Sequence, residues 1–214
     1  MTKLDARADS HSFAEVRREI VTPHAADVKP VTAVKNGLLL ASLDQLQTSG
    51  MYERYAAVVP PHVPVQIRAS LALNWAPVEL ALEHYGACDA MLLGAEAVQG
   101  IGSGVGDRVQ GTSLVSAAKN HQEPGTDLWA ALPPMHRMWA RYYQGGSAQA
   151  LRLGPKEMEV ELLGFVLNKF RYFRQGQLAV INASFAAVGV HLTSAKIVSF
   201  SAVRDELVLH FAWV

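Results

Sequence analysis

Hydrophobic and polar positions follow two different periods along this chain. In the N-terminal two thirds, apolar residues recur at helical spacing, most clearly in APVELALEHYGACDAMLL, where Pro77 suits a first helical turn. Residues 148–164 and 190–214 instead alternate in the manner of strands, and the apolar run over 168–188 between them reads as one long helix ending at Gly189. The pattern therefore predicts a helical N-terminal portion followed by the order β-β-α-β-β.

Short connections within the strand-like segments indicate the sheet topology. Gly154-Pro155 divides the first segment and Arg204-Asp205 the second, so each should form an antiparallel pair. We therefore expect an α+β fold, in which a four-stranded antiparallel sheet has helices packed on one face. The 168–188 helix should bury five side chains on that sheet, namely Phe170, Phe173, Leu178, Ile181 and Phe185.

The first thirty residues differ in composition from the rest of the chain. They are mostly polar, and Ser12 with Glu15 forms a capping-box pattern that predicts a short helix over 12–21. The chain is thus divided into a polar extension over 1–30 and a single α+β domain over 31–214. At the start of that domain, Asn36-Gly37 predicts a turn before the next helical run.

Composition narrows the class of protein. The chain has 214 residues, with 19 Lys and Arg against 19 Asp and Glu. It therefore lacks the excess of basic residues that would indicate a nucleic-acid partner. It carries no secretory signal pattern and no apolar run of the ~20 residues that a membrane span needs. The single cysteine fits a reducing compartment. We expect a cytoplasmic protein with no membrane span.

The stretch VQGIGSGVGDRVQG places a glycine at every second position from Gly100 to Gly106. Neither the dinucleotide fingerprint nor the P-loop fits this spacing, and Asp107 follows where a P-loop needs Lys and Ser or Thr. The run is therefore predicted to bind no nucleotide. It is interpreted as a small-residue segment that lets backbones approach closely, or as a flexible turn.

The remaining polar residues suggest no catalytic constellation. His84 and Cys88 share one helix face, but a metal site needs further ligands, so a buried cysteine and a hydrogen-bonded histidine are the favoured interpretation. His191 and His210 fall near the last two strands as possible neighbours. Neither G-x-S-x-G nor H-E-x-x-H occurs, and the alternating acids Glu157, Glu159 and Glu161 are typical of a solvated face. The sequence thus predicts a protein that is not an enzyme and holds no metal.

Aromatic residues supply the candidate ligand site. The segments LWAALPPMHRMWARYYQGG and KFRYFRQG combine large apolar rings with hydrogen-bonding tips. Such residues form a filled core, or they line an apolar pocket for a small apolar or aromatic ligand. The candidate ligand-binding residues are Trp129, His136, Trp139, Tyr142, Tyr143, Phe170 and Phe173.

The order of several short motifs resembles a myxobacterial paralogous family of unknown function. The resemblance covers about residues 35–214 and rests on LWAAL, WARYYQGG, RLGP, YFRQG and the terminal strand pair that ends at Trp213. That family is distantly similar to 4-vinyl-reductase sensor domains and to the haem–nitric-oxide-binding-associated fold. The resemblance implies a sensor-like domain in which helices cover an antiparallel sheet. Domains of this kind often dimerise and sometimes hold a small apolar ligand.

Two departures from these relatives bear on cofactors. The segment 198–213 lacks the cysteines that bind zinc in many 4-vinyl-reductase domains, and the chain lacks the Tyr-x-Ser-x-Arg signature of haem-binding relatives. No cofactor is therefore expected. The sequence predicts a non-enzymatic small-molecule-sensing or regulatory module that forms a homodimer and signals through a partner protein. The alternative is a structural or protein-interaction module with a filled core and no ligand.

Overall fold

The computed structural model describes residues 18–110, 129, 135–187 and 189–214. Its strands are β1 (Glu19–Thr22), β2 (Ala33–Lys35), β3 (Trp75–Pro77), β4 (Tyr143–Gln144), β5 (Ser147–Gly154), β6 (Glu157–Leu163), β7 (Leu192–Ser201) and β8 (Glu206–Trp213). Its helices are α1 (Asn36–Thr48), α2 (Tyr52–Ala56), α3 (His62–Ala69), α4 (Val78–Ala90), α5 (Ala95–Gln110), α8 (Met135–Tyr142) and α9 (Arg171–Ala187), with a short 3₁₀ helix, η1, at Val166–Lys169.

The main sheet is antiparallel and has five strands in the order β1-β5-β6-β8-β7. Both predicted pairs are confirmed: β5 and β6 meet across the Gly154-Pro155 turn, and β7 and β8 meet across residues 202–205. Asp205 adopts a positive φ of 50° in that second turn, a conformation that Asp tolerates better than most residues. The α+β class is confirmed, whereas the count of four strands is wrong.

The fifth strand comes from the N-terminal extension. Glu19–Thr22 forms β1 and pairs with β5, so the predicted helix over 12–21 is wrong at these residues, and residues 12–17 lie outside the described part of the chain. The capping-box signal is local, whereas β1 gains ladder hydrogen bonds from a strand more than 120 residues away. Tertiary pairing of this kind overrides local helix signals. The division at residue 30 stays a prediction.

The two faces of the main sheet differ sharply in polarity. On one face, Met158, Val160 and Leu162 of β6 lie opposite Phe211, Leu209 and Leu207 of β8, and all six are fully buried. Alternation then places the three glutamates of β6 on the other face, as the sequence predicts. That face is less solvated than expected, because Glu159 is only 9% exposed.

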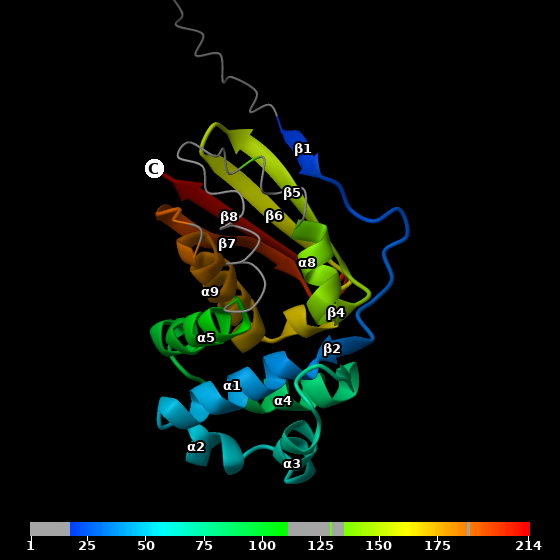
Figure 1. Cartoon of the computed structure of the whole chain (residues 1–214), viewed down its shortest axis with the longest axis vertical. Coiled ribbons are helices and arrows are strands. Elements are labelled where there is room, and N and C mark those ends of the chain that lie inside the picture. Colours follow the sequence, from blue (N-terminus) through cyan, green and yellow to red (C-terminus); the bar gives the residue numbers. More distant parts are fainter. Residues whose placement is uncertain (1–17, 111–128, 130–134, 188) are drawn as a thin grey trace, which may run out of the picture.

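The helices form layers beneath the apolar face. Figure 1 shows the main sheet at the top, α1 to α4 at the bottom, and α5 with α9 between them. The predicted long helix begins at Arg171 and not at residue 168, because η1 and the extended Phe170 precede it. Phe173, Leu178, Ile181 and Phe185 are buried, whereas Phe170 is only partly buried. Phe185 packs on the sheet as expected, against Phe211 and Trp213 of β8, but Phe173 packs against Tyr85 of α4.

The glycine run lies inside α5, which packs against both α9 and α1. A Cβ atom at Gly102 would lie 2.8 Å from Ala179 Cβ and 2.9 Å from the Gly176 carbonyl oxygen. A Cβ atom at Gly106 would lie 2.9 Å from Ala183 Cβ. The close-approach interpretation is therefore confirmed, and the alternative of a flexible turn is wrong, because glycine here permits helix contact.

A second, smaller sheet connects the helical layer to the rest of the domain. It has three strands in the order β3-β2-β4, and the sequence pattern does not reveal it because the strands have two or three residues each. Asn36 begins α1 directly after β2, so the predicted Asn36-Gly37 turn is wrong. Its buried side-chain amide donates to the carbonyl oxygens of Ile67 and Ser70, both at 2.9 Å, which joins α1 to the end of α3.

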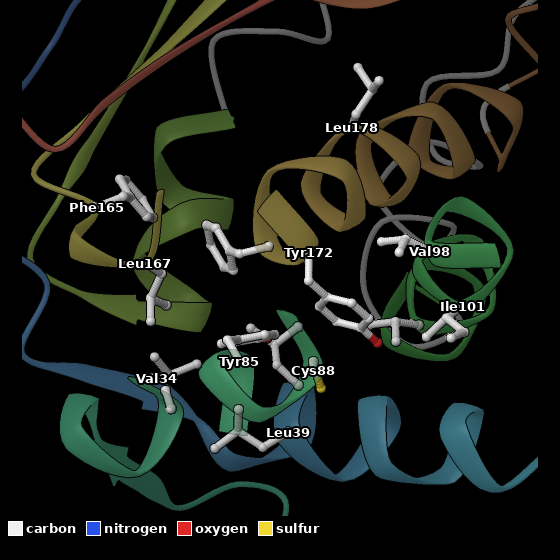
Figure 2. Packing of buried hydrophobic residues seen from close by; sticks show 14 of the residues in the cluster. Val34, Leu39, Tyr85, Cys88, Val98, Ile101, Phe165, Leu167, Tyr172 and Leu178 are labelled. Carbon is white, nitrogen blue, oxygen red and sulfur yellow. The ribbon is translucent and has the colours of Figure 1, made fainter. Parts of the chain in front are cut away.

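Apolar and aromatic side chains fill the interior between these layers. Figure 2 shows Tyr85 and Cys88 of α4 close to Tyr172 of α9, with Val98 and Ile101 of α5 beside them. No described helix is both long enough and apolar enough to cross a membrane.

Candidate ligand-binding site

A pocket of about 580 Å³ opens where α1 meets the C-terminal ends of α5 and α8. Its floor includes Leu38 and Ala41, which are almost fully buried, and its rim includes Leu73 and Trp75, which are more exposed. Pockets of several hundred Å³ with mainly apolar walls are typical small-molecule sites. The described residues that line it are Lys35, Gly37, Leu38, Leu40, Ala41, Ala72, Leu73, Trp75, Arg108, Arg141 and Tyr142.

The charged residues among the described lining are all basic. Lys35 Nζ lies 4.2 Å from the centre of the Trp75 ring, and Arg108 forms an ion pair with Asp44 at 2.5 Å. Arg141 is exposed and forms no ion pair or hydrogen bond with another described residue. The pocket therefore combines an apolar floor with an electropositive rim.

The seven aromatic and histidine residues predicted from the sequence do not form one cluster. Of those whose side chains the structure describes, only Tyr142 lines the pocket. Trp139 and Tyr143 pack with Phe165, with ring centres 5.0–5.7 Å apart. The predicted role of the seven as ligand contacts stays a prediction.

The other members of that set lie elsewhere. Trp129 packs against Trp213 at 5.3 Å and donates from Nε1 to the Pro155 carbonyl oxygen. Phe173 packs against Tyr85 at 5.1 Å, and Phe170 lies over Gly86. The side chain of His136 lies outside the described part of the structure, although its backbone belongs to α8. Trp129, Tyr142 and Phe173 thus have different surroundings.

A buried polar network surrounds His84. Tyr55 Oη lies 2.8 Å from Nδ1, Ser42 Oγ lies 2.9 Å from Nε2, and Cys88 Sγ lies 3.8 Å from the same Nε2. His84 is fully buried, and desolvation lowers its pKa to about 3, so the ring is neutral at pH 7. The favoured interpretation of a hydrogen-bonded histidine beside a buried cysteine is confirmed.

Burial also shifts the pKa values of the side chains around His84. It raises the pKa of the Cys88 thiol, and it raises the pKa of three neighbouring phenols, those of Tyr55, Tyr85 and Tyr172. The Tyr143 pKa is raised by the same cause, although the hydrogen bond from Gln177 opposes the shift. These groups stay protonated at neutral pH, and none of them lines the pocket.

Each of the three glutamates on the acidic face of the main sheet has a basic side chain as its partner. Glu157 pairs with His210 at 2.7 Å, Glu159 with Arg18 at 3.8 Å, and Glu161 with His24 at 3.2 Å. His210 lies opposite Lys196 of β7, so its predicted neighbour His191 is wrong. Among the described residues, no group of three or more His, Cys, Asp or Glu side chains is placed to hold a metal ion.

Comparison with solved structures identifies the fold. The chain resembles an Fe(II) unliganded H-NOX protein from K. algicida, with a TM-score of 0.60 and 7% identity over 84% of this chain and 96% of that chain. It also resembles an oxygen-binding H-NOX domain related to soluble guanylate cyclases, with a TM-score of 0.54 and 9% identity over 84% and 94%. A third similar structure concerns haem distortion in the H-NOX family. Its TM-score is 0.55, with 11% identity over 84% of this chain and 94% of that chain.

These similarities define the class of architecture: the chain has the fold of H-NOX domains. The expected similarity to 4-vinyl-reductase and haem–nitric-oxide-binding-associated sensor domains is confirmed in part, because the similar structures are H-NOX domains. The myxobacterial family stays a prediction. No protein-family model and no curated protein sequence matches the chain.

Haem needs an axial ligand from the protein, commonly a histidine nitrogen or a cysteine thiolate. No described histidine or cysteine supplies such a ligand at the pocket. Both ring nitrogens of His84 are engaged in hydrogen bonds, and Cys88 is a buried thiol with a raised pKa. His24, His62 and His210 each pair with a glutamate, His191 is exposed just before β7, and none of the four lines the pocket. No described histidine or cysteine is therefore placed to hold haem in this pocket.

Most of the pocket lining carries no signal in the sequence pattern. Lys35, Arg108 and Arg141 come from three elements far apart in sequence, and each is an ordinary surface base in its local context. The sequence does mark the start of α1 through Asn36-Gly37 and the apolar run after it, and Gly37 and Leu38 in this first turn line the pocket. Only the tertiary arrangement brings these residues together.

Proposed function

We propose that this protein is a non-enzymatic small-molecule-sensing module whose ligand occupies the pocket beside α1. The observation that carries this proposal is the pocket itself, which has the size and the largely apolar walls of a ligand site. Similarity to H-NOX structures adds support, since one of those proteins is described as an oxygen-binding domain.

The distribution of titratable groups favours binding over catalysis. Catalytic acids and bases usually combine a shifted pKa with a place in a cleft. Here the large shifts belong to core residues such as His84, Cys88 and Tyr143, whose cause is desolvation in a packed interior. The pocket instead offers apolar surface and basic side chains.

The proposal includes a homodimer that signals through a partner protein. Both features rest on the resemblance to sensor domains, because a binding domain of this kind needs an effector to transmit a signal. Light scattering during size-exclusion chromatography measures the molar mass and so tests the homodimer directly. A mass of one chain at micromolar concentration would contradict the dimer.

Native mass spectrometry of protein purified from the organism that encodes it tests the ligand. We expect a bound small molecule in the wild type and its loss in Ala72→Phe, since Ala72 is an exposed lining residue whose enlargement fills the pocket without disturbing the core. Ala57→Phe is the matched control, because Ala57 is also exposed but lies outside the lining. A ligand retained by Ala72→Phe would contradict the pocket as its site.

A structural or protein-interaction module with a filled core and no ligand is the second candidate. The packing of Trp139, Tyr143 and Phe165 favours it, because these rings fill the space under the sheet. If native mass spectrometry finds no ligand in the wild type or either variant, this candidate replaces the first.

Truncating Trp139 tests the role of the aromatic group itself. We expect Trp139→Ala to cost about 2 kcal/mol in the free energy of unfolding, less than a fully buried tryptophan, because the ring is only partly buried. Trp75→Ala, at the pocket rim, is expected to cost less than about 1 kcal/mol. Chemical denaturation measures both. Equal losses would contradict the assignment of Trp139 to the core and Trp75 to the pocket.

A further inference from the structure

We infer that the pocket selects an organic anion: a small molecule with an apolar body and a carboxylate or phosphate group. This inference rests on the proposed function and specifies its ligand. Lys35 at the end of β2, Arg108 in the last turn of α5 and Arg141 in the last turn of α8 converge on one pocket, and no carboxylate is among the described residues that line it.

The basic residues are only partly neutralised within the protein. Asp44 pairs with Arg108 at 2.5 Å and lies 3.9 Å from Arg68, so this one carboxylate is shared between two guanidinium groups. Lys35 contacts the face of Trp75, an interaction that leaves its positive charge in place. Arg141 has no partner among the described residues. A ligand anion therefore finds at least two cations, Lys35 and Arg141, without a competing carboxylate.

The position of the pocket on α1 adds to the same field. Gly37 and Leu38 line it from the first turn of this 13-residue helix, where the helix dipole is positive. The first two backbone N–H groups of α1 donate to the loop before β3, from Asn36 to Asn74 and from Gly37 to Ala72. The dipole thus supplements the basic side chains and does not replace them.

The apolar part of the lining sets the other half of the ligand. Leu38 and Ala41 form a buried floor, Leu40 is half-buried, and Leu73 with Trp75 forms an apolar rim. A purely inorganic anion would leave this surface exposed, and a neutral hydrocarbon would leave the cations without a partner. An amphipathic anion satisfies both, because its body covers the floor while its headgroup meets Arg141 and Lys35.

Calorimetric titration with matched ten-carbon probes tests the charge preference. The probes are decanoate, decyl phosphate, decanol and decyltrimethylammonium, each kept below its micelle concentration. We expect both anions to bind about tenfold or more tighter than decanol, as charge-assisted hydrogen bonds contribute more than neutral contacts, and the cation to bind weakest. The two anions then distinguish a carboxylate from a phosphate headgroup.

Two charge-neutralising variants locate the headgroup. Arg141→Gln is expected to weaken decanoate binding by about five- to tenfold and to leave decanol binding unchanged. Lys156→Gln makes the same change in charge at an exposed residue of the β5–β6 turn, far from the lining, and is expected to change neither. Circular dichroism confirms that each variant is folded.

The outcomes separate this inference from the function on which it rests. Equal binding of decanoate and decanol, or tighter binding of the cation, would overturn the preference for anions while leaving a small-molecule site in place. Equal weakening by Arg141→Gln and Lys156→Gln would overturn the assigned headgroup position. If no probe binds and native mass spectrometry finds no ligand, the proposed function itself fails.

Discussion

Replacing Gly102 by valine is expected to destabilise the protein by about 3 kcal/mol, among the largest effects of any single substitution on this surface of α5. A Cβ atom there would come within 3.0 Å of three atoms of α9, two of them backbone atoms of Gly176 that cannot rotate away. The helices would have to separate, and α5 would lose contact with α9. Chemical denaturation of the variant measures the loss.

Gly100 provides a matched control in the same helix. It is exposed, and a Cβ atom built on it meets nothing within 4 Å. Alanine at this position is therefore expected to stabilise the protein by roughly 0.5–1 kcal/mol through helix propensity alone. If Gly100→Ala and Gly102→Ala change stability in the same direction, close packing does not explain the glycine run.

Acid is expected to destabilise the protein through His84. The unfolded chain takes up a proton near the ordinary pKa of 6.5, whereas burial holds the folded-state pKa at about 3. The stabilising contribution of the neutral ring is therefore complete above pH 6.5 and is lost as the pH falls from 6.5 towards 3. Between pH 7 and pH 4 this one group accounts for about 3 kcal/mol of unfolding free energy.

Denaturant titrations at a series of pH values isolate that contribution. His84→Gln keeps groups that can hydrogen-bond Tyr55 and Ser42 but removes the titration, so its stability should depend less on pH below 6.5. His62→Gln is the control, since His62 is exposed and pairs with Glu83 at the surface. Should His84→Gln fail to fold, the ring signals of wild-type His84 in NMR spectra should stay those of neutral imidazole down to about pH 4. A protonated ring at pH 5 would contradict the expected linkage.

Strong local patterns predicted much of the fold correctly. The alternation around Gly154-Pro155 and Arg204-Asp205 identified both hairpins, and the apolar spacing over 168–188 identified α9 within a few residues. The missed elements lack such patterns. β1 has four residues, and its stability as a strand comes from pairing with β5. The capping signal at Ser12 and Glu15 competes with that distant partner and contains no information about it.

Prediction of the site was weaker, for a related reason. The sequence identifies which segments are rich in large aromatic residues. It does not show whether a given ring faces a cavity or packs on a neighbouring ring. Trp139 packs on other rings, whereas Tyr142, three residues later, lines the pocket. The pocket's basic residues were not distinguishable from other surface bases, because only the approach of β2, α5 and α8 places them together.

Strand β1 has a consequence for any shortened form of this protein. It pairs with β5 from Ala150 to Arg152 and is anchored by the pairs of Arg18 with Glu159 and His24 with Glu161. Removal of residues 1–24 would therefore leave the backbone of β5 as a bare edge and two glutamates without their bases. Unprotected edges recruit further strands from other molecules. N-terminal truncation thus carries an aggregation hazard that is independent of the pocket.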